Sequence, residues 1–440
     1  MSGPRKSSAW LIEAGHLAAL WGLAVVEPTL SVLGREDNLA YFVPGRRVDG
    51  AWFGVLALLL ALLPPLVMVA LEALAGRIGE AVRRRLHAFF IWTLASLLAL
   101  YALEQAARSL ARSPNGAVGL LLAAAAIGAL FAAAYVKFQP VRGLLTVLSV
   151  TPLVSLAAFV LTTPGEELVF GAGSSTPPSA VPSHTPVLVL IWDELPVATL
   201  MGEGGKIDAA RYPNFAKLAA DATWFRNDFA AAESTVQAVP AILTGKLPPG
   251  NEVPVHTSQP HSLFTLLGNS HEITALEHAT WLCPRNLCGD DRSRVQRSVE
   301  ATSALSLLYA SVVVPRGVYA RLGASPPDPG RTWGEALGSE DQTRSVGEIL
   351  AATGDSPSEL ARYPDANFAR FLGLIKPYAP RAGRAPFYFL HAPLPHGPRV
   401  FLPDGKVHSS WDLNMPGVAF DGLSEDLTPC RPTSPDRSRT

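Results

Sequence analysis

The sequence predicts an α-helical membrane domain followed by an α/β domain, and three observations carry this prediction. The mean hydropathy is +0.22 and only 17% of the 440 residues are charged, which is too apolar for an ordinary soluble protein. The apolar residues are concentrated before residue 164. After residue 186, two apolar runs of strand length end in acidic residues or histidines, a pattern typical of buried parallel strands that carry functional side chains at their carboxyl ends.

The membrane domain, residues 1–163, contains five apolar segments, each near the roughly 20 residues that cross a hydrocarbon core. The first contains Glu13, His16 and Glu27, which predicts either a span that faces other helices or a partly interfacial segment. An ion pathway through these three residues is a further hypothesis. The first segment runs into the second without a small-residue cleavage site, so it is not a cleavable signal peptide. The five spans are placed at 9–33, 51–74, 86–106, 116–138 and 142–163.

Basic residues predict the orientation of these spans, because positive loops stay in the cytoplasm. Eight basic residues fall on one side of the predicted topology and five on the other. Everything after residue 164 is therefore expected outside the cytoplasm. The inner set is Arg5, Lys6, Arg77, Arg83, Arg84, Arg85, Lys137 and Arg142, and the outer set is Arg35, Arg46, Arg47, Arg108 and Arg112.

The rest of the chain divides by composition. Residues 164–185 are rich in Pro, Gly and Ser and predict a linker. Residues 186–420 form the α/β domain, in which the apolar stretch 302–322, broken by Pro315, predicts a core helix or a helix on the membrane face. Residues 421–440 are polar and Pro-rich without periodicity, which predicts a disordered tail.

The cysteines indicate the compartment of the protein, and the net charge excludes one class of partner. Cys283 and Cys288 are a local pair that favours a small disulfide-closed loop in an oxidising compartment over a zinc site, and Cys430 is then the odd thiol. The formal net charge of −1 and the absence of a basic patch argue against a nucleic-acid partner.

Two segments contain candidate catalytic and metal-binding residues. In residues 230–245, AAAESTVQAVPAILTG, the hydroxyl of Thr235 is either a nucleophile or a cap that opens a helix. Residues 186–195, PVLVLIWDEL, predict a buried strand that ends in Asp193 and Glu194. These carboxylates are either metal ligands or acids that cap a strand or pair with an arginine.

Two more segments complete a pattern: residues 209–225, AARYPNFAKLAADATWF, and residues 387–405, FYFLHAPLPHGPRVFLPDG, with His391 and His396. The four segments, in this order, resemble the sulfatase-like branch of the alkaline phosphatase superfamily. The five-span phosphoethanolamine and phosphoglycerol transferases of cell envelopes are the most similar group. Gln237 and Val239 stand where sulfatases have the Pro and Arg of their formylglycine motif, so an unmodified Thr nucleophile is expected.

The resemblance implies a three-layer α/β/α fold and metal-dependent hydrolysis or transfer of a sulfate or phosphate ester. Thr235 would attack, and Asp193, Glu194 and Thr235 would hold a divalent ion, zinc first, with manganese, calcium or magnesium as alternatives. His396 would contact the anionic group or the leaving oxygen. His391 is a second substrate-binding candidate or a core histidine. The substrate would be a lipid or envelope glycan ester, at a bacterial-type plasma membrane.

The chain also departs from this family. The family closes its metal site with an Asp-His-Gly turn, and this sequence contains no Asp-His dipeptide. Asp404 and His408 are weak substitutes. The sequence therefore predicts an incomplete domain, the product of truncation or a frameshift. The alternative is a non-catalytic membrane protein that retains the fold as a binding or scaffold module.

Overall fold

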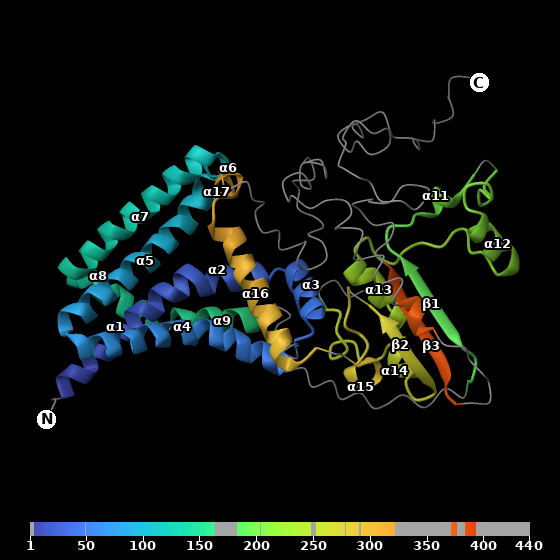
Figure 1. Cartoon of the computed structure of the whole chain (residues 1–440), viewed down its shortest axis with the longest axis horizontal. Coiled ribbons are helices and arrows are strands. Elements are labelled where there is room, and N and C mark those ends of the chain that lie inside the picture. The colour runs from blue at the N-terminus through green and yellow to red at the C-terminus, as the bar shows by residue number, and fades with distance from the viewer. Residues whose placement is uncertain are drawn as a thin grey trace, which may run out of the picture. The chain divides into compact units, whose positions relative to one another are not determined.

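The structure, a computed structural model, describes most of the membrane domain and parts of the remainder (Figure 1). Most of the predicted linker, His396, Asp404, His408, Cys430 and the predicted tail lie outside the described residues. The chain divides into two compact units, Met1–Leu190 with Phe225–Leu337 and Lys376–His391, and Ile191–Trp224 with Gly338–Ile375 and Ala392–Thr440. The described residues are 4–48, 50–162, 183–202, 204–247, 252–277, 279–289, 292–321, 371–375 and 383–392.

Five helical segments of the described part are long and apolar enough to cross a membrane, as predicted. The first consists of α1 (Pro4–Trp21), the π-helix η1 (Gly22–Val26) and α2 (Glu27–Leu33). The fifth consists of α8 (Gln139–Val147), the 3₁₀ turn η2 (Leu148–Val150) and α9 (Thr151–Thr162). Between them lie α4 (Gly50–Ile78), α5 (Glu80–Ala106) and α7 (Pro114–Lys137).

The first span faces other helices, which is the first of the two predicted alternatives. Leu17, Leu20 and Val26 are almost completely buried. At Gly22 a Cβ atom would lie 2.8 Å from the ring of Pro152, so α9 packs directly on the π-helix. The hydroxyl of Tyr309 donates to the carbonyl oxygen of Ala24 (2.9 Å). This bond satisfies one of the backbone groups that a π-helix releases from the regular ladder.

The boundary between the second and third spans differs from the prediction. We expected a loop between residues 74 and 86, but α4 continues to Ile78 and α5 begins at Glu80, so that only Gly79 separates them. The segment Glu80–Arg85 lacks a second helix breaker and contains good helix formers, which explains the extension. Arg83 is consequently a buried helix residue that pairs with Glu80 and Glu13, whereas Arg84 is exposed.

Several helices outside the spans pack on one end of the membrane domain (Figure 1). The predicted loop before the second span contains α3 (Glu36–Arg46), whose Leu39, Phe42 and Val43 are buried. The apolar stretch at 302–322 belongs to α16 (Arg294–Val313) and α17 (Arg316–Arg321), which separate before Pro315. α16 packs on α2, α3 and α5, and α17 packs on α7 and on α6 (Arg108–Arg112). The stretch therefore forms parts of two helices that cover one end of the span bundle.

A small sheet of β1 (Val187–Trp192), β2 (His271–Leu276) and β3 (Ala385–Ala392) has the order β1-β3-β2. β2 and β3 are parallel, from His271 opposite Ala385 to Leu276 opposite Leu390. Phe264 packs on the rings of Phe387 and Phe389 at centroid distances of 5.7 and 5.2 Å. β1 and β3 correspond to the two predicted strands, β2 was not predicted, and the three-layer arrangement stays a prediction. The remaining helices are α11 (Val197–Leu200), α12 (Pro213–Asp221), α13 (Thr235–Thr244), α14 (Leu263–Leu267) and α15 (Arg285–Cys288).

Gly128 permits the close contact between α5 and α7. A Cβ atom at Gly128 would lie 2.8 Å from the backbone oxygen of Trp92 and 2.9 Å from the backbone nitrogen of Ser96. Gly128→Ala is expected to lower the free energy of unfolding by about 1–3 kcal/mol, the usual cost of overpacking. Gly119→Ala, in the same helix, is the matched control because no atom lies within 4 Å of its Cβ position. Thermal unfolding in detergent measures both, and equal midpoints for the two variants would contradict this account of the contact.

Candidate functional site

Thr235 is the first residue of α13, and its side chain is half-buried. The residue before it, Ser234, occupies the cap position with extended backbone angles (φ −95°, ψ 136°) and makes no side-chain cap hydrogen bond. Thr235 is therefore not the helix cap. The first turn of a helix presents backbone N–H groups and the positive end of the helix dipole, which favours a negatively charged group beside the Thr235 hydroxyl.

Helix α13 is firmly anchored. Val236, Val239 and Leu243 are buried, and Val236 belongs to an apolar core with Val253 and Trp281. Val239, which stands where sulfatases have an arginine, is 2% exposed, so this position serves packing. Gly245 ends the helix in the left-handed region (φ 67°) and donates its N–H to Ala241 (2.9 Å). The start of α13, with Thr235, is thus held in place by the core beneath it.

Asp193 and Glu194 follow directly after β1. The N–H of Asp193 donates to the carbonyl oxygen of Ala392, the last residue of β3 (3.0 Å), so the carboxyl ends of β1 and β3 are neighbours. Asp193 is half-buried and Glu194 is exposed. Glu194 has a φ of 55°, a left-handed conformation that is uncommon for residues other than glycine and is concentrated at functional sites. Both acidic residues therefore lie at a sheet edge of the kind where α/β proteins bind ligands.

His391 lies near the end of β3, and the structure pairs it with an acid that sequence reasoning missed. Its Nδ1 is 3.3 Å from Oε1 of Glu277, and both side chains are nearly completely buried. Glu277 Oε1 also accepts the N–H groups of Ala279 (2.8 Å) and Thr280 (2.9 Å). His391 is therefore a buried histidine paired with a carboxylate at the end of β3. In the sequence Glu277 directly follows β2 as Asp193 follows β1, but β2 is too polar to stand out as a buried strand.

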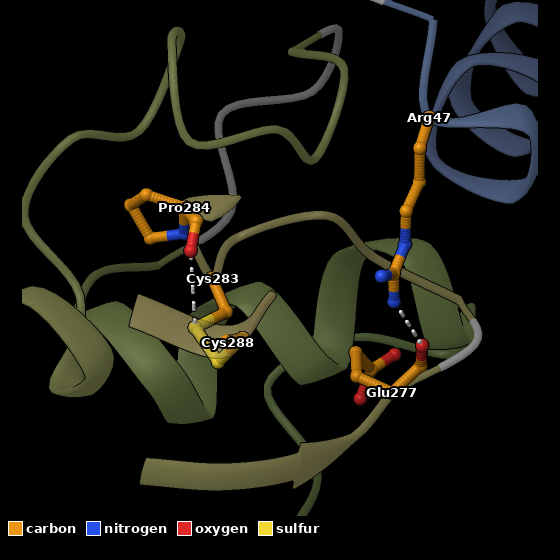
Figure 2. The surroundings of a disulfide bond; sticks show 5 residues. All are labelled: Arg47, Glu277, Cys283, Pro284 and Cys288. Carbon is orange, nitrogen blue, oxygen red and sulfur yellow. Dashed lines mark hydrogen bonds between the residues drawn. A yellow bond between two sulfur atoms is a disulfide. The ribbon is translucent and has the colours of Figure 1, made fainter. Parts of the chain in front are cut away.

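A disulfide joins Cys283 to Cys288, with the Cα atoms 6.0 Å apart (Figure 2). Within this loop, the guanidinium of Arg285 donates to the carbonyl oxygen of Arg47 (2.8 Å). The guanidinium of Arg47 donates to the carbonyl oxygen of Glu277 (3.2 Å), as Figure 2 shows. The end of α3 is therefore bonded both to the disulfide loop and to the segment that follows β2.

The three predicted metal ligands do not all belong to the same compact unit. Asp193 and Glu194 lie in the second compact unit and Thr235 in the first. Two carboxylates and a hydroxyl are hard donors that suit a divalent ion, although they provide one group fewer than the three His, Cys, Asp or Glu ligands typical of zinc. Within the described part of the chain, one group of three such side chains has the right spacing for a metal, and it consists of Glu13, Glu72 and His87 in the membrane helices.

Comparisons with protein-family models, with curated proteins and with solved structures find no match to this chain.

Proposed function

We propose that this membrane protein is a metal-dependent enzyme that hydrolyses or transfers a sulfate or phosphate ester, with Thr235 as its nucleophile. The observation that carries the proposal is the position of Thr235 as the first residue of an anchored helix, behind a different cap residue. A hydroxyl in this position can approach an anionic ester whose oxygens bind the N–H groups of the helix start. A helix cap alone would not require a second hydroxyl residue after Ser234.

The proposed roles of the other residues follow from their chemistry. Asp193 and Glu194 would hold the divalent ion, and the strained backbone of Glu194 (φ 55°) supports a functional role for that position. When bound, such an ion acts as a Lewis acid on the ester oxygens. His396 would contact the anionic group or the leaving oxygen. The pairing of His391 with Glu277 favours a role for His391 in supporting the sheet end over contact with substrate.

Activity of the purified full-length chain in detergent is the primary test. An aryl phosphate or aryl sulfate is expected to be hydrolysed, hydrolysis is expected to stop on treatment with a chelator, and zinc or manganese is expected to restore it. The ester that is hydrolysed faster identifies the substrate class. A well-folded preparation that hydrolyses neither ester with any added divalent ion would favour the non-catalytic binding or scaffold protein instead.

The location proposed for the catalytic part is outside the cytoplasm. α3, α6, α16 and α17 pack at the span ends opposite to those that carry Arg77, Arg84 and Arg142, and positive span ends are cytoplasmic. The disulfide between Cys283 and Cys288 also fits an oxidising compartment.

Single cysteines test this orientation in a Cys430→Ser background. Arg84→Cys and Arg108→Cys form a matched pair, because both side chains are exposed and they lie at opposite ends of α5 and the α5–α7 connection. A membrane-impermeant maleimide added to intact cells is expected to label Arg108→Cys and to leave Arg84→Cys unlabelled until the membrane is opened. The reverse pattern would place the catalytic part in the cytoplasm.

A further inference from the structure

A cluster of polar side chains lies inside the membrane helices, independent of the proposed ester site. His16, Glu72, Arg83 and His87 are each at most 7% exposed. Glu72 lies six residues before the end of α4, and His87 lies seven residues after the start of α5, which places both about 10 Å along their helices from the basic end of the bundle. Ionisable groups at such depth are costly and are functional candidates by default. The cluster consists of Glu13, His16, Glu72, Glu80, Arg83, His87, Tyr135 and Thr146.

A chain of hydrogen bonds fixes the direction in which these groups donate. Thr146 has one hydroxyl hydrogen, which it donates to the carbonyl oxygen of Arg142 (2.9 Å), so its oxygen accepts from Nε2 of His16 (2.9 Å). A neutral His16 then accepts at Nδ1 from the hydroxyl of Tyr135 (2.8 Å). The oxygen of Tyr135 must in turn accept from Nε2 of His87 (2.9 Å). The network thereby assigns the hydrogen of a neutral His87 to Nε2.

This assignment leaves the other ring nitrogen of His87 with a lone pair, and that lone pair faces a carboxylate. Nδ1 of His87 lies 2.9 Å from Oε1 of Glu72. Two acceptors at this distance repel each other unless a positive charge lies between them. A histidine whose Nε2–H is oriented by a fixed acceptor, with its Nδ1 directed at a carboxylate, has the arrangement of a metal-binding imidazole.

The buried carboxylate of Glu72 needs a neighbouring positive charge. Glu13 pairs with the guanidinium of Arg83 (2.5 Å), and Glu80 pairs with Arg83 (2.7 Å) and with Arg84 (3.8 Å). Glu72 is 3% exposed, and its partner among the ion pairs of the described residues is the imidazole of His87 (2.9 Å). An unbalanced charge inside a membrane is expensive, so either a proton or a metal ion is expected between these two side chains.

A third ligand is in place on a third helix. Ligand atoms of Glu13 in α1, Glu72 in α4 and His87 in α5 all lie within 4.8 Å of one another. Arg83 binds Oε2 of Glu13 (2.5 Å) and stacks over the ring of Trp10 at 5.4 Å, so it orients this carboxylate and leaves Oε1 for a ligand. One imidazole nitrogen and two carboxylates suit zinc, manganese or ferrous iron.

We propose that Glu13, Glu72 and His87 form a divalent transition-metal site within the membrane helices. The ion would bind between Nδ1 of His87 and the carboxylates of Glu72 and Glu13, and it would tie α1, α4 and α5 together near the basic end of the bundle. Ligand binding to the folded state alone raises stability, so metal should raise the unfolding temperature of the chain.

The test uses the full-length chain with Asp193→Asn and Glu194→Gln, which removes the other proposed metal ligands and makes the result independent of the ester site. Titration with Co²⁺ is expected to show one bound equivalent with visible absorption bands and a raised unfolding temperature. Adding Glu72→Gln or His87→Gln is expected to abolish both signals. Adding Glu104→Gln, which changes a carboxylate of α5 outside the cluster, is expected to preserve both signals. If the folded parent variant binds no Co²⁺, the proposal is overturned. The contact between His87 and Glu72 is then explained by a shared proton.

If Glu72→Gln or His87→Gln does not fold, X-ray absorption of the Co²⁺-loaded parent variant identifies the ligands of the ion directly. A coordination sphere with one imidazole nitrogen and carboxylate oxygens supports the site. A sphere of oxygens alone, or of two or more imidazoles, contradicts it.

Discussion

Replacing Thr235 with alanine is expected to abolish ester turnover while leaving the protein folded. Removal of the nucleophile in a covalent mechanism costs on the order of 10⁴- to 10⁶-fold in kcat. Thr235→Ser, which keeps the hydroxyl, is expected to retain part of the activity. The structural cost of Thr235→Ala is small, because alanine is a good helix former and Ser234, not Thr235, is the cap residue. The measurement is the rate of aryl ester hydrolysis, with the far-UV circular dichroism of each variant.

Thr244→Ala is the matched control for this prediction. Thr244 is the last residue of the same helix, and its hydroxyl donates to the carbonyl oxygen of Pro240 (2.7 Å). Its loss removes this bond and the one that its oxygen accepts from the N–H of Lys246 (3.3 Å), each worth about 1 kcal/mol, without touching the proposed nucleophile. Comparable loss of activity in Thr244→Ala and Thr235→Ala would indicate that α13 acts through its packing, and Thr235 would lose its assigned role.

The second large effect is expected at Asp193 and Glu194. Asp193→Asn and Glu194→Gln remove the charges that would hold the ion, and metal content and activity should fall together. The several kcal/mol that a Lewis acid contributes correspond to a loss on the order of 10²- to 10³-fold in rate. Activity is measured as initial rate, and bound metal is measured by elemental analysis of the same preparation.

Variants of Glu194 can distinguish a role of its backbone conformation from a role of its carboxylate. Its φ of 55° is better tolerated by asparagine or glycine. If the residue merely turned the chain, Glu194→Asn and Glu194→Gly would keep activity and stabilise the protein by up to about 1 kcal/mol. We expect both variants to be folded and nearly inactive. Full activity in either one would remove Glu194 from the metal site.

The sequence predicted the membrane part well because hydropathy over some 20 residues is a strong signal. The number of spans agreed with the structure, and the errors have local causes. The end of α4 and the start of α5 were misplaced because charged residues such as Arg83 extend a helix beyond the apolar core when no breaker intervenes. α3 was missed because its 11 residues include Asn38, Pro44 and Gly45, which indicate a loop in a sequence.

The sequence did not predict the partners of the polar residues in the membrane helices, because these partners are far away in the sequence. Glu13 and His16 were recognisable as unusual within an apolar segment. Their partners were not, because His16 bonds to Tyr135, 119 residues away, and Glu13 to Arg83, 70 residues away. Glu27, grouped with them in the sequence-based ion-pathway hypothesis, begins α2 and lies outside the cluster. Periodicity along one helix carries no information about which helix lies opposite.

The candidate ester site was predictable in its local elements. The strand before Asp193 lies where the sequence placed it, and a helix begins at Thr235, where the sequence left open a nucleophile or a cap that opens a helix. Glu277 was not singled out, because β2 (His271–Leu276) is short and contains His271, Glu272 and Thr274, which weaken its resemblance to a buried strand. The pairing of His391 with Glu277 could not be deduced without the parallel register of β2 and β3.

A covalent intermediate on Thr235 tests the central claim most directly. The purified chain is incubated with an aryl phosphate or aryl sulfate, quenched with acid and digested, and the peptide that contains Thr235 is sequenced by mass spectrometry. The account predicts that this threonine gains the mass of one phosphoryl or sulfuryl group, that a chelator prevents the gain, and that Asp193→Asn diminishes it. Ester hydrolysis that proceeds while Thr235 stays unmodified, or with the group on another residue, would contradict it.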